Sequence, residues 1–146
     1  MLDGPNKPRL GALLQTTQIA WRQAVGAALE QRNAPVLGAG MDLLVQLSLS
    51  GISQSLLAER LGMSKQAVQQ SIDQLERLGL VRRDRDPVDK RAKYVVLTEA
   101  GLYAVEARRD AERDVERQWE QALGKKTFNR LRKALRKTGT ALSQAQ

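Results

Sequence analysis

The charged segment DRDPVDKRAK at 84–93 is the first place where this sequence could do chemistry. Seven of its ten residues are charged, both signs are mixed, and the apolar run YVVL at 94–97 follows directly. Guanidinium and ammonium groups bind phosphate oxygens, so such a segment suits contact with a polyanion. The alternative is a solvated hairpin tip whose screened ion pairs contribute little.

Four cationic side chains of this segment are candidates for contact with nucleic acid: Arg85, Lys90, Arg91 and Lys93. We expect them to approach the phosphate backbone, and one of them to enter the adjacent minor groove. The acidic residues between them do not suit phosphate contacts. An Asp that precedes an Arg by two residues can instead accept its hydrogen bonds and fix the direction of the guanidinium. A screened surface ion pair is the alternative on local grounds.

Polar side chains also gather on one face of a helix predicted between Ser64 and Gly79. Val68, Ile72 and Leu75 recur at helical spacing and predict its buried face. Amide and amine groups near the start of such a helix suit base edges and phosphates in a major groove, whereas a plain solvated helix more often carries Glu–Lys pairs. A polar solvated face remains the alternative. The outward positions are Lys65, Gln66, Gln69, Gln70 and Asp73.

A shorter helix is predicted directly before this one, and the two together would support the polar face. Ser53 can cap the shorter helix, and Gly62 ends it before Ser64 caps the next. Its apolar side is formed by Leu56, Leu57 and Leu61. Two short helices joined by a tight turn that contains glycine form a helix-turn-helix. By itself this pair is a weak signal, because any helical hairpin has the same pattern.

After Gly79 the apolar periodicity changes from helical to alternating. Segments 80–84 and 93–98 have the pattern of two strands, and the eight-residue connection between them contains Pro87. We therefore predict a β-hairpin, and its place directly after a candidate recognition helix makes it a wing. The charged segment is then the tip of this wing.

Residues 57–101, from LAERLG through DKRAKYVVLTEAG, resemble the MarR family of winged helix-turn-helix transcription regulators. The family's wing motif Asp-x-Arg stands here as Asp89-Lys90-Arg91. The resemblance implies that Arg91 reaches the minor groove and that Asp89 orients it. It also implies an obligate homodimer on a pseudo-palindromic operator, with the first helix, the last helix and the helix after the wing at the dimer interface. A small aromatic or phenolic effector, of the kind the family often binds, is implied as well.

The ends of the chain are predicted to be long amphipathic helices, over 9–32 and 99–123, with a further helix after Gly124 and a short one from 41 to about 49. A monomer of this size would struggle to cover them beside a compact winged core, so burial against a second copy is the natural solution. An intrachain bundle is the alternative. The positions expected at the dimer interface are Leu10, Leu14, Phe128, Leu131, Leu135 and Leu142.

The formal net charge of +8 suggests a polyanionic partner, but the charge is unevenly distributed. Residues 125–146 contain seven basic residues and no acidic one, whereas 94–124 contain four basic and seven acidic residues. The basic tail would neutralise the acidic helix across a dimer, which is the interpretation we prefer. It would otherwise add nonspecific attraction to DNA.

Cysteine and histidine are both absent from the 146 residues. Their absence excludes disulfides, thiolate catalysis and cysteine-based redox sensing, and it removes the commonest general base and metal ligand. We therefore predict no enzymatic activity, no metal and no cofactor besides the effector. The apolar stretches are far shorter than the roughly 20 residues that span a bilayer, and no signal peptide is recognisable, so we expect a cytoplasmic protein without membrane contact.

These observations predict a mainly α (α+β) fold in one MarR-like domain over 1–146. Residues 9–50 and 99–146 would be mainly dimerisation helices, and 51–98 would form the winged helix-turn-helix. The expected function is sequence-specific binding of double-stranded DNA by a homodimeric transcription repressor, relieved by a small-molecule effector. The alternatives are a ligand-independent or architectural DNA-binding protein and a winged-helix dimer that binds other proteins.

Overall fold

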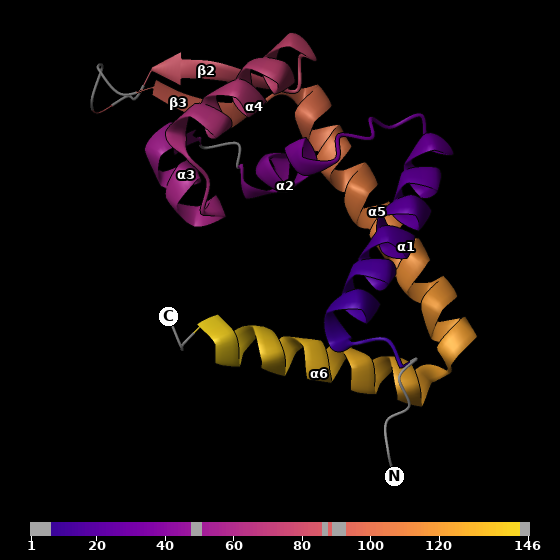
Figure 1. Ribbon diagram of the computed structural model, residues 1–146. Coiled ribbons are helices and arrows are strands. Elements are labelled where there is room, and N and C mark those ends of the chain that lie inside the picture. Colours follow the sequence, from indigo (N-terminus) through magenta and orange to yellow (C-terminus); the bar gives the residue numbers. More distant parts are fainter. Residues whose placement is uncertain (1–6, 48–50, 86–87, 89–92, 144–146) are drawn as a thin grey trace. The chain divides into compact units, whose positions relative to one another are not determined.

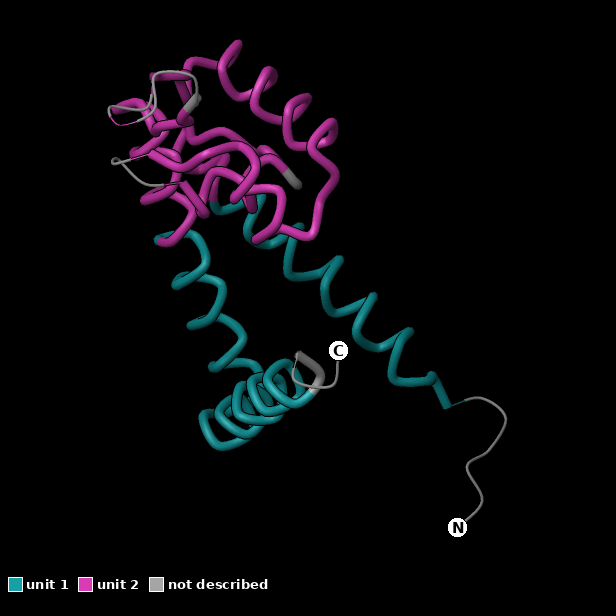
Figure 2. The backbone as a smooth tube through the Cα atoms, turned by 90° about the vertical axis from the view of Figure 1, so that its left-hand side faces the viewer, with its two compact units in different colours: residues 1–28, 110–146 teal, residues 29–109 magenta. Residues whose placement is uncertain are grey.

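The computed structural model describes residues 7–47, 51–85, 88 and 93–143. Within these ranges the chain forms six helices and one small antiparallel sheet, which confirms the predicted mainly α (α+β) fold class (Figure 1). The chain divides into two compact units, residues 1–28 with 110–146 and residues 29–109 (Figure 2). The elements in chain order are α1 (Leu10–Glu30), α2 (Ala39–Gln46), β1 (Ile52–Ser53), α3 (Gln54–Leu61), α4 (Lys65–Arg77), β2 (Val81–Arg85), β3 (Lys93–Leu97), α5 (Glu99–Leu123) and α6 (Lys125–Ser143).

The helix-turn-helix is formed by α3 and α4, and its boundaries are the predicted ones. The Ser53 hydroxyl accepts a hydrogen bond from the backbone N–H of Leu56 at 3.2 Å and caps α3. Gly62 then takes the left-handed conformation (φ 60°) that ends α3, a backbone geometry that residues with a Cβ rarely adopt. Ser64 caps α4 in the same way as Ser53 caps α3.

The sheet has the strand order β1-β3-β2, and both pairings are antiparallel. The wing hairpin runs in register from Val81 opposite Leu97 to Arg85 opposite Lys93, which confirms the predicted pair of strands. Side chains alternate between the two faces of a strand, and this alternation in the sequence is what predicted β2 and β3. The sequence carries no signal for β1, because two residues are too short to show alternation.

One hydrophobic core holds residues 29–109 together and gives α4 a rigid support. Val68 and Ile72 of α4 are completely buried, and so is Leu57 of α3. Residues from α2 and from the first turns of α5 belong to the same core, so these helices contribute to the winged unit as well. They are Met41, Leu43, Leu44, Ala104 and Val105.

The start of α5 is joined closely to the end of the α4–β2 turn. The backbone N–H of Thr98 donates to the carbonyl of Leu80 at 3.1 Å, and the Thr98 hydroxyl donates to the carbonyl of Gly79 at 2.6 Å. A Cβ on Gly101 would lie 1.9 Å from that Leu80 oxygen, so only glycine fits there. The base of the wing is therefore tied to the start of α5 by the backbone and the hydroxyl of Thr98.

The other unit consists of most of α1, the second half of α5 and α6. Its clearest contact is between Trp21 of α1 and Trp119 of α5, whose rings meet edge to face with centroids 5.2 Å apart. Arg113 and Arg117 pair with the Asp residues three positions before them on α5. None of the helices in the described ranges is long and apolar enough to cross a membrane.

Candidate nucleic-acid interface

The polar face of α4 is exposed over the predicted contact positions. Its apolar face is fully used by the core, since Val68 and Ile72 are 0% exposed and Leu75 is 2% exposed. A helix held this firmly along one side presents the other side in a fixed orientation. The side chains exposed on that side include the predicted Lys65, Gln66, Gln69 and Gln70.

The first turn of α4 has the properties that a phosphate group requires. The Ser64 hydroxyl accepts from the backbone N–H of Ala67 at 3.1 Å, and its own hydrogen stays available for donation. Backbone N–H groups in the first turn of a helix lack intrahelical partners and carry partial positive charge. Lys65 is exposed at the same end and adds a full positive charge.

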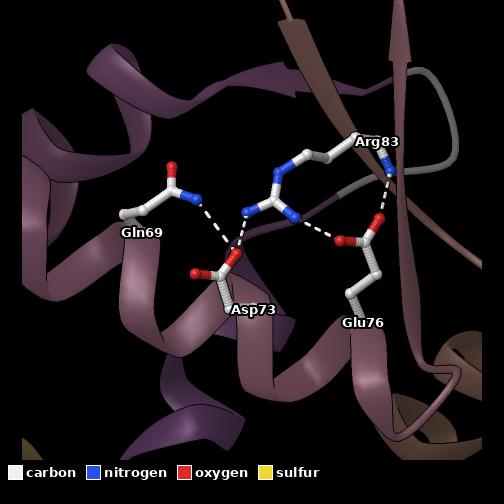
Figure 3. Close-up of polar contacts among 4 residues, drawn as sticks. All are labelled: Gln69, Asp73, Glu76 and Arg83. Carbon is white, nitrogen blue, oxygen red and sulfur yellow. Dashed lines mark hydrogen bonds and ion pairs between the residues drawn. The ribbon is translucent and has the colours of Figure 1, made fainter.

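Asp73 does not simply complete the exposed polar face, as the helical spacing suggested. Its Oδ1 accepts a hydrogen bond from Gln69 Nε2 at 2.9 Å, and the same atom forms an ion pair with Arg83 of β2 (Figure 3). Arg83 also forms an ion pair with Glu76 Oε2, while its backbone N–H donates to Glu76 Oε1 at 3.2 Å. One guanidinium therefore bridges two carboxylates of α4 and joins the recognition helix to the wing.

Arg83 and Glu76 were not among the predicted site residues, although the sequence held a partial signal for Arg83. Val81 is buried, and a strand places the side chains of residues 81 and 83 on the same face. Arg83 is accordingly directed inward, with a side chain only 20% exposed, whereas the Arg82 side chain is 64% exposed. Which carboxylates it would meet depended on how α4 packs against β2.

The structure describes part of the predicted wing contact. Arg85 is exposed at the end of β2, and Lys93 is its partner in the β2–β3 register. Asp84 accepts from the backbone N–H of Arg85 at 2.9 Å and lies 3.5 Å from the guanidinium of Arg82. The other predicted contacts, Asp89, Lys90 and Arg91, lie outside the described residues.

A model of the MarR family matches residues 38–92. The match contains α2, the whole helix-turn-helix and β2, which together carry the capped recognition helix and the Arg83 bridge. Over these residues the winged helix-turn-helix is similar to that of the MarR family. The resemblance seen in the sequence is thereby confirmed.

Solved MarR-family structures have the same fold over nearly the entire chain. Wild-type MarR from E. coli in its apo form is 21% identical, with a TM-score of 0.70 over 91% of this chain and 98% of that one. The S. aureus MepR–DNA complex is 23% identical, with a TM-score of 0.71 over 92% and 99%. A MarR-family regulator from Rhodococcus sp. RHA1 is 24% identical, with a TM-score of 0.65 over 86% and 90%. No curated protein matches the sequence.

The terminal helices α1 and α6 carry the positions predicted for a dimer interface. Leu10 and Leu14 of α1 are 71% and 48% exposed, and Leu135 of α6 is 50% exposed. Leu131 is half-buried. Phe128 is buried within the chain itself, and the guanidinium of Arg132 lies 5.9 Å from the centre of its ring. The side chain of Leu142 is outside the described part of the chain.

Metal chemistry receives no support from the carboxylates of this site. Among the described residues, no group of three or more His, Cys, Asp or Glu side chains is placed to hold a metal ion. The carboxylates nearest the recognition face, Asp73 and Glu76, are engaged with Arg83 instead. What the arrangement offers is an exposed row of amide and amine groups on a firmly packed helix, next to a hairpin that carries basic residues.

Proposed function

We propose that this protein is a sequence-specific transcription regulator that binds double-stranded DNA as a homodimeric repressor on a pseudo-palindromic operator. The observation that carries the proposal is the division of α4 into a completely buried apolar face and an exposed face of amide and amine groups. Such a helix can enter a major groove without any rearrangement of the core. The similarity in fold to MepR, which has been crystallised with DNA, supports the same interpretation.

In this proposal the contacts on α4 divide into readers and anchors. Gln66, Gln69 and Gln70 read base edges, because an amide can donate and accept at once. Lys65 and the Ser64 hydroxyl contact phosphates at the start of the helix, where the helix dipole also favours negative charge. The readers should determine which sequences bind, and the anchors should determine how tightly any sequence binds.

The wing supplies the second part of the proposed contact. Arg85, Lys90 and Lys93 meet phosphates, while Arg91 enters the minor groove and Asp89 holds it there. A guanidinium held in one orientation has already lost its rotamer entropy, so binding costs less. A narrow A·T-rich minor groove gives such a group the strongest electrostatic attraction.

The dimer is supported by apolar side chains that one chain leaves uncovered. Several large apolar residues of α1, α5 and α6 are 45% exposed or more, which is unfavourable unless another surface covers them. A second copy would bring a second α4, and two recognition helices suit the two halves of a palindromic site. These residues are Leu10, Leu13, Leu14, Ile19, Leu123 and Leu135.

The proposal is tested by selecting bound fragments from random-sequence duplex DNA. We expect a pseudo-palindromic motif to be enriched, and the purified motif to bind about 10³-fold or more tightly than scrambled DNA at the same salt concentration. Binding of all duplexes alike would indicate an architectural protein. Absence of DNA binding at moderate salt would favour the alternative role as a dimer that binds other proteins.

The wing assignment makes a prediction that differs in sign from simple electrostatics. Asp89→Asn makes the wing more positive, so charge alone predicts tighter binding to all DNA. If Asp89 orients Arg91, operator binding should instead weaken while binding to random DNA is preserved. Arg91→Lys keeps the charge but loses the planar donor fork, so it should weaken operator binding as well. A titration of each variant on operator and random DNA at fixed salt decides between the two accounts. Tighter operator binding by Asp89→Asn would exclude the orienting role of Asp89.

An effector is the remaining part of the proposal, and it rests on the family resemblance alone. A small aromatic or phenolic acid that binds the folded dimer should raise the melting temperature in proportion to the logarithm of its concentration. It should also weaken operator binding if it relieves repression. A panel of such acids that changes neither quantity would favour a ligand-independent regulator.

A further inference from the structure

We infer that Asp73, held by Arg83, fixes the side-chain amide of Gln69 in one orientation and thereby makes Gln69 a reader of adenine. The inference rests on the proposed function, because it specifies what one residue of the DNA-binding face recognises. It concerns three positions on one stripe of α4, since Gln69, Asp73 and Glu76 are separated by four and three residues. Figure 3 shows this stripe with Arg83 approaching it from β2.

The Asp73 carboxylate is itself fixed in place. The Arg83 guanidinium contacts Asp73 through one terminal nitrogen and Glu76 through the other. Glu76 additionally accepts the backbone N–H of Arg83 at 3.2 Å, so the bridge is anchored to the strand and not only to a flexible side chain. The Arg83 side chain is 20% exposed, compared with 44% for Asp73, which places the positive charge on the protected side of the pair. A planar guanidinium can serve two carboxylates in this way, whereas a Lys ammonium lacks the fork.

A fixed carboxylate determines in which direction the side-chain amide of Gln69 is turned. An ionised carboxylate only accepts hydrogen bonds, so the NH₂ group of Gln69 must face Asp73 and the carbonyl oxygen must point elsewhere. The 2.9 Å contact from Nε2 to Asp73 Oδ1 has this arrangement (Figure 3). A glutamine without such a partner can rotate its amide and present either group to a base. Among the described residues, neither Gln66 nor Gln70 has a comparable contact.

The groups that remain on Gln69 match one base better than the others. Nε2 carries two hydrogens, and only one of them is needed for Asp73. One N–H and the carbonyl oxygen are left, and adenine offers an acceptor at N7 and a donor at N6 in the major groove. Guanine presents two acceptors at the same edge and would leave the carbonyl oxygen facing an acceptor. Asp73 and Arg83 are therefore positioning residues that determine specificity through Gln69.

The test compares the motifs selected from random-sequence duplex DNA by the full-length protein and its variants. The wild type should select an adenine at one position of each half-site. Asp73→Asn allows the amide to rotate, so preference at that position should fall about tenfold while the other positions keep theirs. Binding to random DNA should stay equal or rise, because a negative charge has been removed from the DNA-facing surface.

Two further variants separate this role from a general structural one. Arg83→Lys should relax the same position as Asp73→Asn, since it keeps the charge but not the fork. Arg82→Lys is the matched control, because Arg82 is the adjacent residue of β2, is exposed, and is 3.5 Å from Asp84 instead of contacting α4. It should leave the motif unchanged. In a Gln69→Ala background, Asp73→Asn should have no further effect at the adenine position.

Several results would overturn the inference. An unchanged motif for Asp73→Asn, or a uniform gain in affinity for all sequences, would show that Asp73 acts only through its charge. Relaxation that persists in the Gln69→Ala background would show that another residue is involved. If Arg83→Lys fails to fold by circular dichroism, Asp73→Asn alone decides, since Asp73 is 44% exposed. A wild type that selects no motif would instead overturn the proposed function, and this inference with it.

Discussion

α4 and α6 are both amphipathic helices with basic residues, but the chain buries their apolar sides to very different extents. In α4 the apolar residues Val68 and Ile72 are 0% exposed. In α6 the repeat of apolar residues at intervals of three and four is equally regular. Among the side chains of α6 that the structure describes, only Phe128 at its start is buried, whereas Leu135 is 50% exposed. Amphipathicity alone therefore does not reveal what covers a helix.

The difference indicates that the two helices acquire their stability from different sources. α4 packs into a core that one chain provides, so its outer face is free to contact another molecule. The apolar side of α6 is left partly exposed by the same chain, and residues 125–146 contain seven basic residues and no acidic one. We therefore expect α4 to be insensitive to oligomeric state and α6 to depend on it.

Removal of residues 125–146 should have the largest effect. We expect the truncated chain to sediment as a monomer or to aggregate, because the apolar residues that faced α6 would be exposed. Loss of the dimer would also remove the second half-site contact and weaken operator binding by about 10²–10⁴-fold. Sedimentation velocity and an operator titration measure the two effects. A truncated chain that sediments as a stable dimer would show that α6 is dispensable for association.

A pair of alanine substitutions compares the two apolar faces directly. Ile72→Ala should lower the free energy of unfolding by about 2–5 kcal/mol, since it leaves a cavity in a fully packed core. This loss should not depend on protein concentration. Leu135→Ala should cost less, and its cost should shrink as the protein is diluted, because the dimer that it weakens contributes less to stability at low concentration. Denaturant unfolding at several protein concentrations measures the loss of stability for both variants. Equal losses that do not depend on concentration would contradict the difference between the two apolar faces.

The smallest expected effect concerns the basic residues of the two helices. Lys65→Ala should weaken binding to all sequences alike and reduce the dependence of log K on log salt by about one per bound copy. Arg136→Ala in α6 is the matched control. In the interpretation that we prefer, the basic tail neutralises the acidic α5 across the dimer. Arg136→Ala should therefore leave the salt dependence of DNA binding unaltered. A slope reduced equally by both variants would instead assign the tail to nonspecific DNA attraction.

The sequence by itself determined the local elements of the winged region and the type of surface that they present. The 3.6-residue periodicity of Val68, Ile72 and Leu75 identified the buried face of α4, and therefore its exposed face as well. Ser64 and Gly62 marked the helix boundaries because caps depend only on nearby backbone groups. Alternation identified the strands of the wing for the same reason. These features are predictable because the interactions that produce them span only a few residues.

The tertiary structure alone decided which of the polar residues act together. Gly101 has no local signal for its role, since it is required by a carbonyl 21 residues earlier in the chain. Arg83 could be placed on the inner face of its strand, but its partners, seven and ten residues earlier, depended on the packing of α4 against β2. The outward spacing of Asp73 likewise suggested a DNA-facing group, and the structure shows it engaged by Arg83. Contacts of this kind depend on how separate elements pack, and a pattern within one element cannot contain that information.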